Sequence, residues 1–144
     1  MAEQVRCLLF AYGTLRQGEV QHGLLASARL LRMASTPPAF YLVEVAPYAA
    51  LVRGGSTSVT GELYEVDLAT RRVIDVERQV PQLFTRETIE LADGTSADAY
   101  LLTSEQVRGR RRLGHGDWKK RFSRSISPQA GGAWVEWARG RWSK

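Results

Sequence analysis

The sequence predicts one domain that contains both strands and helices, and three observations support this fold class. An apolar run at residues 7–12 stops at a glycine, which is typical of a buried strand. Two β-rich runs flank Asp93 and Gly94, a dipeptide that favours a tight turn between antiparallel strands. Residues 68–78 carry apolar side chains at helical spacing. With 144 residues, one such domain buries about 68–70% of the surface of its unfolded chain.

The strand at residues 7–12 leads into Gly13, and this junction is the first candidate binding site. Glycine has no Cβ, so the backbone can turn tightly there and approach a ligand closely. The successive N–H groups that follow would point at one spot, where a carboxylate or a carbonyl oxygen could bind. A core strand followed by an ordinary loop has the same composition, so this pattern alone does not separate the two interpretations.

Helix and strand signals alternate in the next part of the chain. Leu24, Ala28 and Leu31 recur at helical spacing and predict a short helix within residues 22–31. His22, at its start, is expected on the surface, although it could face a site. After two prolines, residues 39–45 are rich in aromatic and β-branched side chains and predict a strand, and residues 46–52 form another apolar piece.

Two loops and three further strands are predicted from turn chemistry and alternation. Residues 53–58 form a Gly/Ser loop that lacks the ending of a phosphate-binding loop, which argues against nucleotide binding. Residues 59–66 alternate as a strand does. Residues 84–91 and 96–102 are expected to pair as a hairpin, with residues 92–95 as its turn.

The helix expected at residues 68–78 carries the first candidate catalytic group, Glu77. Asp67 can cap its first turn, and Pro81 marks its end. Glu77 lies at the margin of the apolar stripe, whereas Asp75 is expected to point into water. A carboxylate at the edge of the core is partly removed from water, as an acid-base catalyst requires, although a solvated glutamate with a basic neighbour is the alternative. The stripe consists of Ala69, Val73, Val76 and Val80.

The composition excludes several classes of protein. One cysteine, Cys7, cannot form an internal disulfide, and the two histidines leave no zinc-binding spacing, so neither a metal nor another cofactor is expected. No signal peptide or membrane-spanning run is apparent, and we expect a cytoplasmic protein without membrane association. The formal charge is +5, but residues 108–124 alone carry +7. We expect residues 1–144 to form a single domain with a basic, tryptophan-containing extension from about residue 119.

Four motifs together resemble the gamma-glutamylcyclotransferase-like family, which includes gamma-glutamylamine cyclotransferases and AIG2-like proteins. Residues 12–16 read Tyr-Gly-Thr-Leu-Arg, and residues 59–66 are similar to the family's Val-x-Gly-Glu-Leu-Tyr-x-Val strand. Residues 73–86 contain a glutamate and an arginine at family spacing, and residues 114–118 resemble a Gly-Gly-Asp-Trp motif. The resemblance covers residues 8–118. It implies an α+β fold with a small curved or barrel-like mixed sheet flanked by two main helices.

The resemblance also implies an activity and a set of site residues. It implies that the protein releases 5-oxoproline and a free amine from a gamma-glutamyl amide. Glu77 would be the general acid and base, and neither a metal nor a cofactor would be needed. Ile74, Arg78 and Phe84 depart from the family pattern, which bears on substrate preference. The substrate-binding residues that the resemblance and the local patterns indicate are Tyr12, Gly13, Thr14, Leu15, Tyr48, Arg86 and Tyr100.

Two alternatives stay open at this point. The chain could be a non-catalytic binding module of the same fold. It could also bind nucleic acid or another acidic partner through residues 108–124, where Trp118 and Phe122 add stacking faces to the charge, although such basic runs are usually solvated surface. The expected partner is a small gamma-glutamyl compound, and the sequence leaves its amine and the oligomeric state open. Beyond Phe122, the expectation is that Trp134, Trp137 and Trp142 fold back onto the domain or onto a partner.

Overall fold

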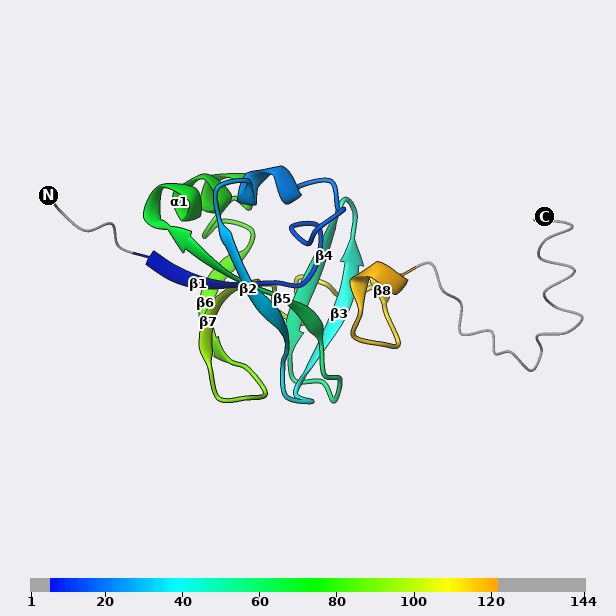
Figure 1. The fold of residues 1–144 in the computed structure, drawn as a ribbon. Coiled ribbons are helices and arrows are strands. Elements are labelled where there is room, and N and C mark those ends of the chain that lie inside the picture. Colours follow the sequence, from blue (N-terminus) through cyan, green and yellow to red (C-terminus); the bar gives the residue numbers. More distant parts are fainter. Residues whose placement is uncertain (1–5, 122–144) are drawn as a thin grey trace, which may run out of the picture.

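The computed structural model describes residues 6–121, which form one mixed sheet of eight strands with a single α-helix (Figure 1). The α-helix is α1 (Leu68–Glu77), and two 3₁₀ helices are η1 (His22–Leu25) and η2 (Trp118–Lys120). The strands are β1 (Arg6–Ala11), β2 (Arg29–Ser35), β3 (Phe40–Val45), β4 (Tyr48–Arg53), β5 (Thr60–Asp67), β6 (Thr85–Glu90), β7 (Ser96–Leu101) and β8 (Arg111–Arg112).

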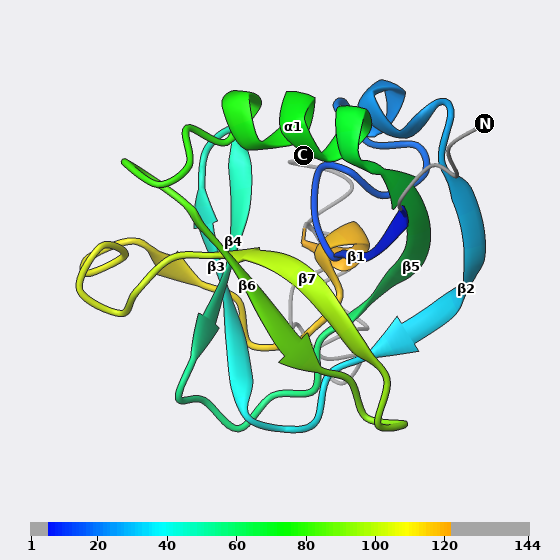
Figure 2. The ribbon, with the colours of Figure 1, turned by 90° about the vertical axis from the view of Figure 1, so that its left-hand side faces the viewer.

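The strands follow the order β2-β5-β1-β7-β4-β3-β8, and β6 pairs with β7 beside this path. Most pairs are antiparallel, but β1 and β4 each run parallel to β7. The sheet curves strongly, and α1 lies across one of its ends (Figure 2). Because the path ends at β2 and β8, the sheet is curved and open, and it does not close into a barrel. The expected α+β class is therefore confirmed.

Both faces of the central strand β1 are buried, as the sequence predicts for residues 7–12. Phe10 belongs to a core cluster enclosed by the curved sheet, whereas Leu9 and Ala11 belong to a second cluster that includes Ile74 of α1. Alternate side chains of a strand point to opposite faces, so a strand between two clusters needs a continuous apolar run. This double burial explains why no polar residue interrupts the run before Gly13.

The other predicted strands are confirmed, including the hairpin. β6 and β7 pair in register, and Gly94 in the turn between them has a φ of +91°. That left-handed conformation favours glycine and explains the Asp-Gly signal. The predicted Gly/Ser loop begins one residue later than expected, because Arg53 still belongs to β4, and it contains one isolated bridge, from Phe40 to Thr57.

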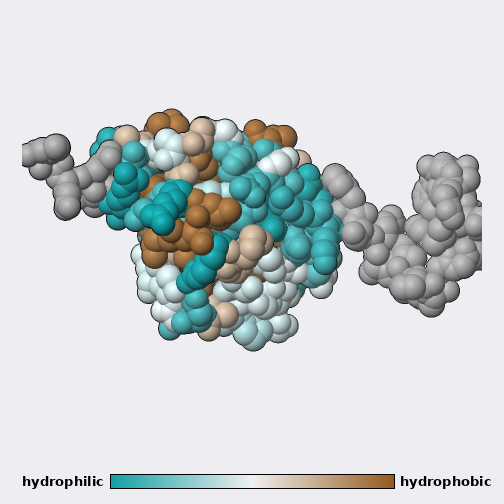
Figure 3. Space-filling model, in the orientation of Figure 1, coloured by the Kyte–Doolittle hydropathy of each residue, from teal (hydrophilic) through white to brown (hydrophobic). Residues whose placement is uncertain are grey.

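The helix predicted within residues 22–31 is wrong beyond its first turn. Only η1 is helical there, and β2 follows, pairing antiparallel with β5. Pairing with an available sheet edge outweighs the weak helix preference of this segment. The side chains of Leu30, Leu31 and Met33 are exposed along β2, on a face where Figure 3 shows an apolar area among hydrophilic residues. Among residues 6–121 there is therefore one α-helix, and the expected second main helix is absent.

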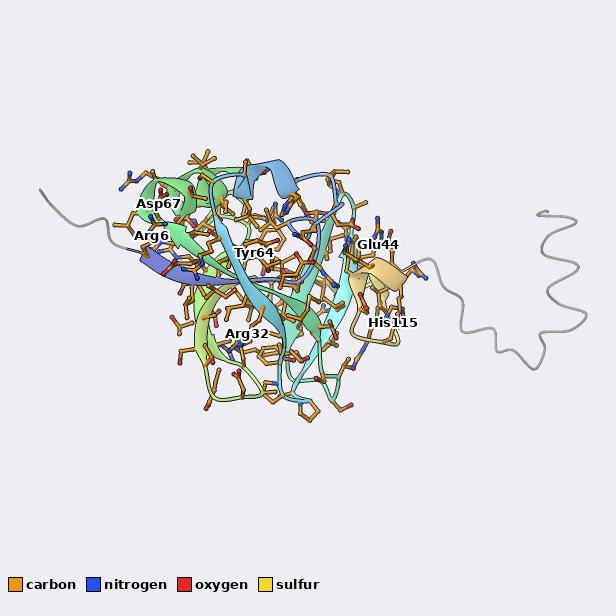
Figure 4. The ribbon with its side chains drawn as sticks, viewed as in Figure 1. Arg6, Arg32, Glu44, Tyr64, Asp67 and His115 are labelled. Carbon is orange, nitrogen blue, oxygen red and sulfur yellow. The ribbon has the colours of Figure 1, made fainter. Side chains whose placement is uncertain are left out.

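Helix α1 begins as predicted but turns a different side to the sheet. The Asp67 carboxylate accepts a hydrogen bond from the Thr70 N–H at 2.7 Å, and this bond lowers the pKa of Asp67; its strand partner Arg6 lies opposite (Figure 4). The expected apolar stripe is not buried, because Val73 and Val76 are 53% and 74% exposed. Ile74 is fully buried instead. The contacts of Ile74 and its neighbours with the sheet set the rotation of the helix.

Within residues 6–121, no helix is long and apolar enough to cross a membrane. Trp134, Trp137 and Trp142 lie outside the described residues, as do Phe122 and Arg124. The single domain over residues 1–144 and its C-terminal extension stay predictions.

Candidate active site

The turn after β1 presents backbone N–H groups beside the end of α1. Arg16 N–H donates to the Gly13 carbonyl at 3.0 Å, and Gln21 N–H donates to the Thr14 carbonyl at 2.9 Å. No described residue accepts a hydrogen bond from the N–H groups of Gly13, Thr14 and Leu15. His22 Nδ1–H donates to the Leu15 carbonyl at 2.9 Å, so this histidine fastens the turn. The turn can therefore donate hydrogen bonds to a negatively charged oxygen.

Glu77, the last residue of α1, is half-buried and held by two side chains from other parts of the chain. Gln21 Nε2 donates to Glu77 Oε2 at 2.5 Å. The Tyr48 hydroxyl lies 3.2 and 3.3 Å from the two carboxylate oxygens and donates to them. Both partners donate hydrogen bonds to the Glu77 carboxylate, so they hold it in one orientation between η1 and β4.

Gln21 is a site residue that the sequence analysis missed. Its Oε1 accepts hydrogen bonds from the Thr14 hydroxyl and from Arg78 Nη1, both at 2.7 Å, while its Nε2 holds Glu77. One amide therefore connects the turn after β1 with the end of α1. No composition or spacing signal marks Gln21, because its role depends on residues about 56 positions away.

Arg78 follows Glu77 and is buried, with 4% of its surface exposed. Its guanidinium lies over the ring of Tyr48, 4.5 Å from the centroid, and 5.6 Å from the ring centre of Phe84. Nη2 donates to the Thr14 hydroxyl at 3.0 Å. Aromatic faces attract a cation, so the two rings hold the guanidinium against the turn.

Tyr12 and Tyr100 support the site from the sheet. The buried Tyr12 hydroxyl donates to the Tyr100 carbonyl at 2.5 Å and accepts a hydrogen bond from the Leu51 N–H at 3.2 Å. Burial raises the pKa of Tyr12 to about 12, and the positive charge of Arg78 opposes this shift. Tyr12 thus stays protonated near neutral pH and acts as a brace between β1, β4 and β7.

Arg86 and the Tyr100 hydroxyl meet Asp75, not Glu77. The Tyr100 hydroxyl donates to Asp75 Oδ1 at 2.6 Å, and Arg86 forms an ion pair with the same carboxylate. Burial and this hydrogen bond raise the pKa of Tyr100. The expectation that Asp75 points into water is wrong, because the sheet supplies two partners for it. The predicted site residues are therefore divided between two carboxylates of α1. Tyr48 contacts Glu77, whereas Arg86 and the Tyr100 hydroxyl contact Asp75.

The Gly-Asp-Trp motif contacts the residue that follows the turn. Asp117 Oδ1 accepts a hydrogen bond from Arg16 Nη1 at 2.8 Å, and Arg16 Nε lies 3.2 Å from Glu62 on β5. Glu62 also accepts a hydrogen bond from the hydroxyl of Tyr64, a residue labelled in Figure 4, at 2.9 Å. Arg16 and Glu62 are both almost fully buried. This network connects the start, the middle and the end of the described chain.

The described part of the basic residues 108–124 makes several contacts within the molecule. Arg111 pairs with Glu44 at 2.9 Å, and Arg121 pairs with Glu19 at 3.1 Å. The Arg112 guanidinium lies 3.9 Å from the ring centre of Tyr41. These contacts join residues 111–121 to β3 and to the loop before η1.

Two cavities adjoin the residues around Glu77. A small one lies beneath the turn and is lined by Tyr12, Gly13, Leu15, Ala49, Arg78 and Tyr100, among others. A larger cleft of about 340 Å³ is lined by Tyr48, Phe84 and Arg110, among others. A carboxylate held by two donors, beside unpaired N–H groups and a buried cation, can orient an anionic substrate and transfer a proton.

Known proteins resemble this chain in sequence over most of its length. The family model described as "Gamma-glutamyl cyclotransferase, AIG2-like" matches residues 9–120. A Vibrio cholerae protein named "Putative gamma-glutamylcyclotransferase" is 40% identical over 114 residues, which are 79% of this chain and 96% of that protein.

Solved structures share the fold. The c4763 protein of uropathogenic Escherichia coli has a TM-score of 0.71 at 23% identity, and the match covers 82% of this chain and 96% of that one. The Escherichia coli protein ytfP has a TM-score of 0.61 at 28% identity, and the match covers 81% and 99% of the two chains.

Proposed function

The chain belongs to the gamma-glutamyl cyclotransferase, AIG2-like family, and from this membership we propose that it releases 5-oxoproline and a free amine from a gamma-glutamyl amide. The observation that carries the proposal is the position of the Glu77 carboxylate, which Gln21 connects to the turn at residues 13–15. The proposed partner is a small gamma-glutamyl compound.

In the proposed reaction, the substrate's α-amine attacks its own γ-carbonyl carbon. A new C–N bond closes the five-membered ring, the original amide C–N bond breaks, and one proton passes from the attacking nitrogen to the leaving nitrogen. Nucleophile and electrophile belong to the same molecule, so the reaction gains from orientation and needs no nucleophile from the protein. The protein has to hold the substrate, stabilise the oxyanion and transfer the proton.

The residues around the turn suit these three tasks. The N–H groups of Gly13, Thr14 and Leu15 would donate to the α-carboxylate and to the developing oxyanion. Glu77 would accept the proton of the α-amine and pass it to the leaving nitrogen. Tyr48 donates to Glu77 and would keep its carboxylate oriented during both transfers.

Replacement of Glu77 by glutamine tests the proposal. We expect Glu77→Gln to fold as the wild type does and to lower the rate of 5-oxoproline formation by about 10²–10⁴-fold, because an amide cannot accept and return a proton. The measurement is chromatographic detection of 5-oxoproline after incubation with a panel of gamma-glutamyl amides of amino acids and alkylamines.

Glu90→Gln is the matched control, because Glu90 is exposed on β6 and should leave the rate unchanged. A Glu77→Gln protein that kept more than about a tenth of the wild-type rate would remove Glu77 from its proposed role. Binding of these compounds by the wild type without release of 5-oxoproline would instead support a non-catalytic binding module.

A further inference from the structure

Arg78 places a buried positive charge at the proposed site. Only 4% of the residue is exposed to solvent. A charged group is costly to bury unless an opposite charge or several hydrogen bonds compensate for the lost water.

The described residues compensate this charge only in part. None of their carboxylates lies within 4.0 Å of the guanidinium nitrogens of Arg78. Of its five N–H donors, one reaches the Gln21 side-chain oxygen and one the Thr14 hydroxyl, both neutral acceptors. The rings of Tyr48 and Phe84 contact the guanidinium without accepting a conventional hydrogen bond.

The same guanidinium lies beside the unpaired N–H groups of the turn. Arg78 lines the small cavity together with Tyr12, Gly13 and Leu15. The small cavity is therefore lined both by the turn, whose N–H groups have no described acceptor, and by a residue with a full positive charge. An anionic group bound there would complete the hydrogen bonds of the turn and also neutralise Arg78.

We propose that Arg78 binds the α-carboxylate of the gamma-glutamyl group and makes that carboxylate a requirement for recognition. This inference rests on the proposed function. The α-amine and the α-carboxylate of the substrate are bonded to the same carbon, so the residues that contact them have to be neighbours. Glu77 and Arg78 meet this condition, because the Gln21 amide donates to the carboxylate and accepts from the guanidinium.

The test compares two ligands in two backgrounds by calorimetry. The ligands are gamma-L-glutamyl-ethylamide and its α-carboxamide analogue, which differ only in the charged group. In the Glu77→Gln protein, which should not turn the ligands over, we expect the carboxylate compound to bind about ten- to a hundredfold more tightly, as charge-assisted hydrogen bonds do. In Glu77→Gln/Arg78→Met, the two ligands should bind within about threefold of each other, because methionine fills the site without a charge.

Arg78→Lys in the same background keeps the charge and should retain part of the preference for the carboxylate ligand. This variant also provides a measurement if the methionine variant does not fold. Arg71→Met is the matched control, because Arg71 is on the same helix but pairs with Asp98 at 3.1 Å; its ligand preference should equal that of the parent.

Three results would overturn the inference. The Arg78→Met variant could keep the preference for the carboxylate ligand, or it could lose affinity for both ligands equally. The third result is that the Glu77→Gln parent binds neither ligand. The proposed chemistry fails separately. If the wild type formed no 5-oxoproline but bound the carboxylate compound in an Arg78-dependent manner, the cyclotransferase proposal would be wrong and the carboxylate site would stand.

Discussion

Gly13 is the residue at which the candidate site leaves no space for a side chain. A Cβ added there would lie 2.7 Å from the Cβ of Ala49 on β4, closer than side chains tolerate. Its backbone does not have a positive φ, so the requirement for glycine comes from packing. The small residue therefore lets the turn approach β4 closely.

We therefore predict that Gly13→Val abolishes binding of gamma-L-glutamyl-ethylamide and lowers the melting temperature, because the turn has to move away from Ala49. Calorimetry on the Glu77→Gln background measures the first effect, and thermal unfolding measures the second. Gly114→Val is the control, since a Cβ at Gly114 meets no atom within 4 Å. Unchanged ligand affinity in Gly13→Val would remove the turn from the site.

Helix α1 positions both proposed functional groups, and its rotation decides which residues it presents. Ile74 is fully buried between the helix and the sheet, whereas Val76 is 74% exposed. Rotation of the helix about its axis would move Glu77 and Arg78 away from Gln21, which holds both side chains. The packing of Ile74 is thus part of how the fold places the site.

Two substitutions on α1 should therefore differ in their effect on stability. Ile74→Ala should lower the free energy of unfolding by about 2–5 kcal/mol, because it leaves a cavity in the second core cluster. Val76→Ala should change it by less than about 0.5 kcal/mol, since exposed positions contribute little. Urea denaturation followed by circular dichroism measures both. Equal losses in the two variants would mean that α1 turns another side to the sheet.

Across the whole molecule, Arg16 connects segments that are far apart in the sequence. Its buried guanidinium reaches Glu62 on β5 and Asp117 in the Gly-Asp-Trp motif, 46 and 101 positions away. Glu62 also accepts a hydrogen bond from the Gln17 N–H at 2.9 Å, directly after Arg16. The network therefore holds the chain downstream of the Gly13 turn against the sheet.

We predict that Glu62→Gln destabilises the protein by about 3 kcal/mol, because it removes one of the carboxylates that compensate a buried guanidinium. The free energy of unfolding in urea is again the measurement. The matched control is Glu87→Gln, which breaks an exposed pair with Arg53 and should cost about 0.2–1 kcal/mol. A loss in Glu62→Gln no larger than in this control would show that Asp117 alone compensates Arg16.

Several features of the fold could be predicted because their signals are local. The buried strand before Gly13, the Asp67 cap, the hairpin at Gly94 and the family motifs all follow from residues within a few positions of one another. Their physical causes are local as well: backbone conformation, the capping of free N–H groups and the alternation of a strand. Glu77 could be singled out in this way because a helix and a motif both contain it.

The long-range partners of these residues could not be predicted, because they depend on how the whole chain folds. Residues 29–35 became a strand because the edge of β5 was available to pair with them. The valine stripe of α1 faces outward because Ile74 and the partners of Asp75 hold the opposite side against the sheet. Gln21 and the burial of Arg78 left no periodic signal. Such contacts join residues distant in sequence, and their energies depend on a three-dimensional arrangement that local patterns do not encode.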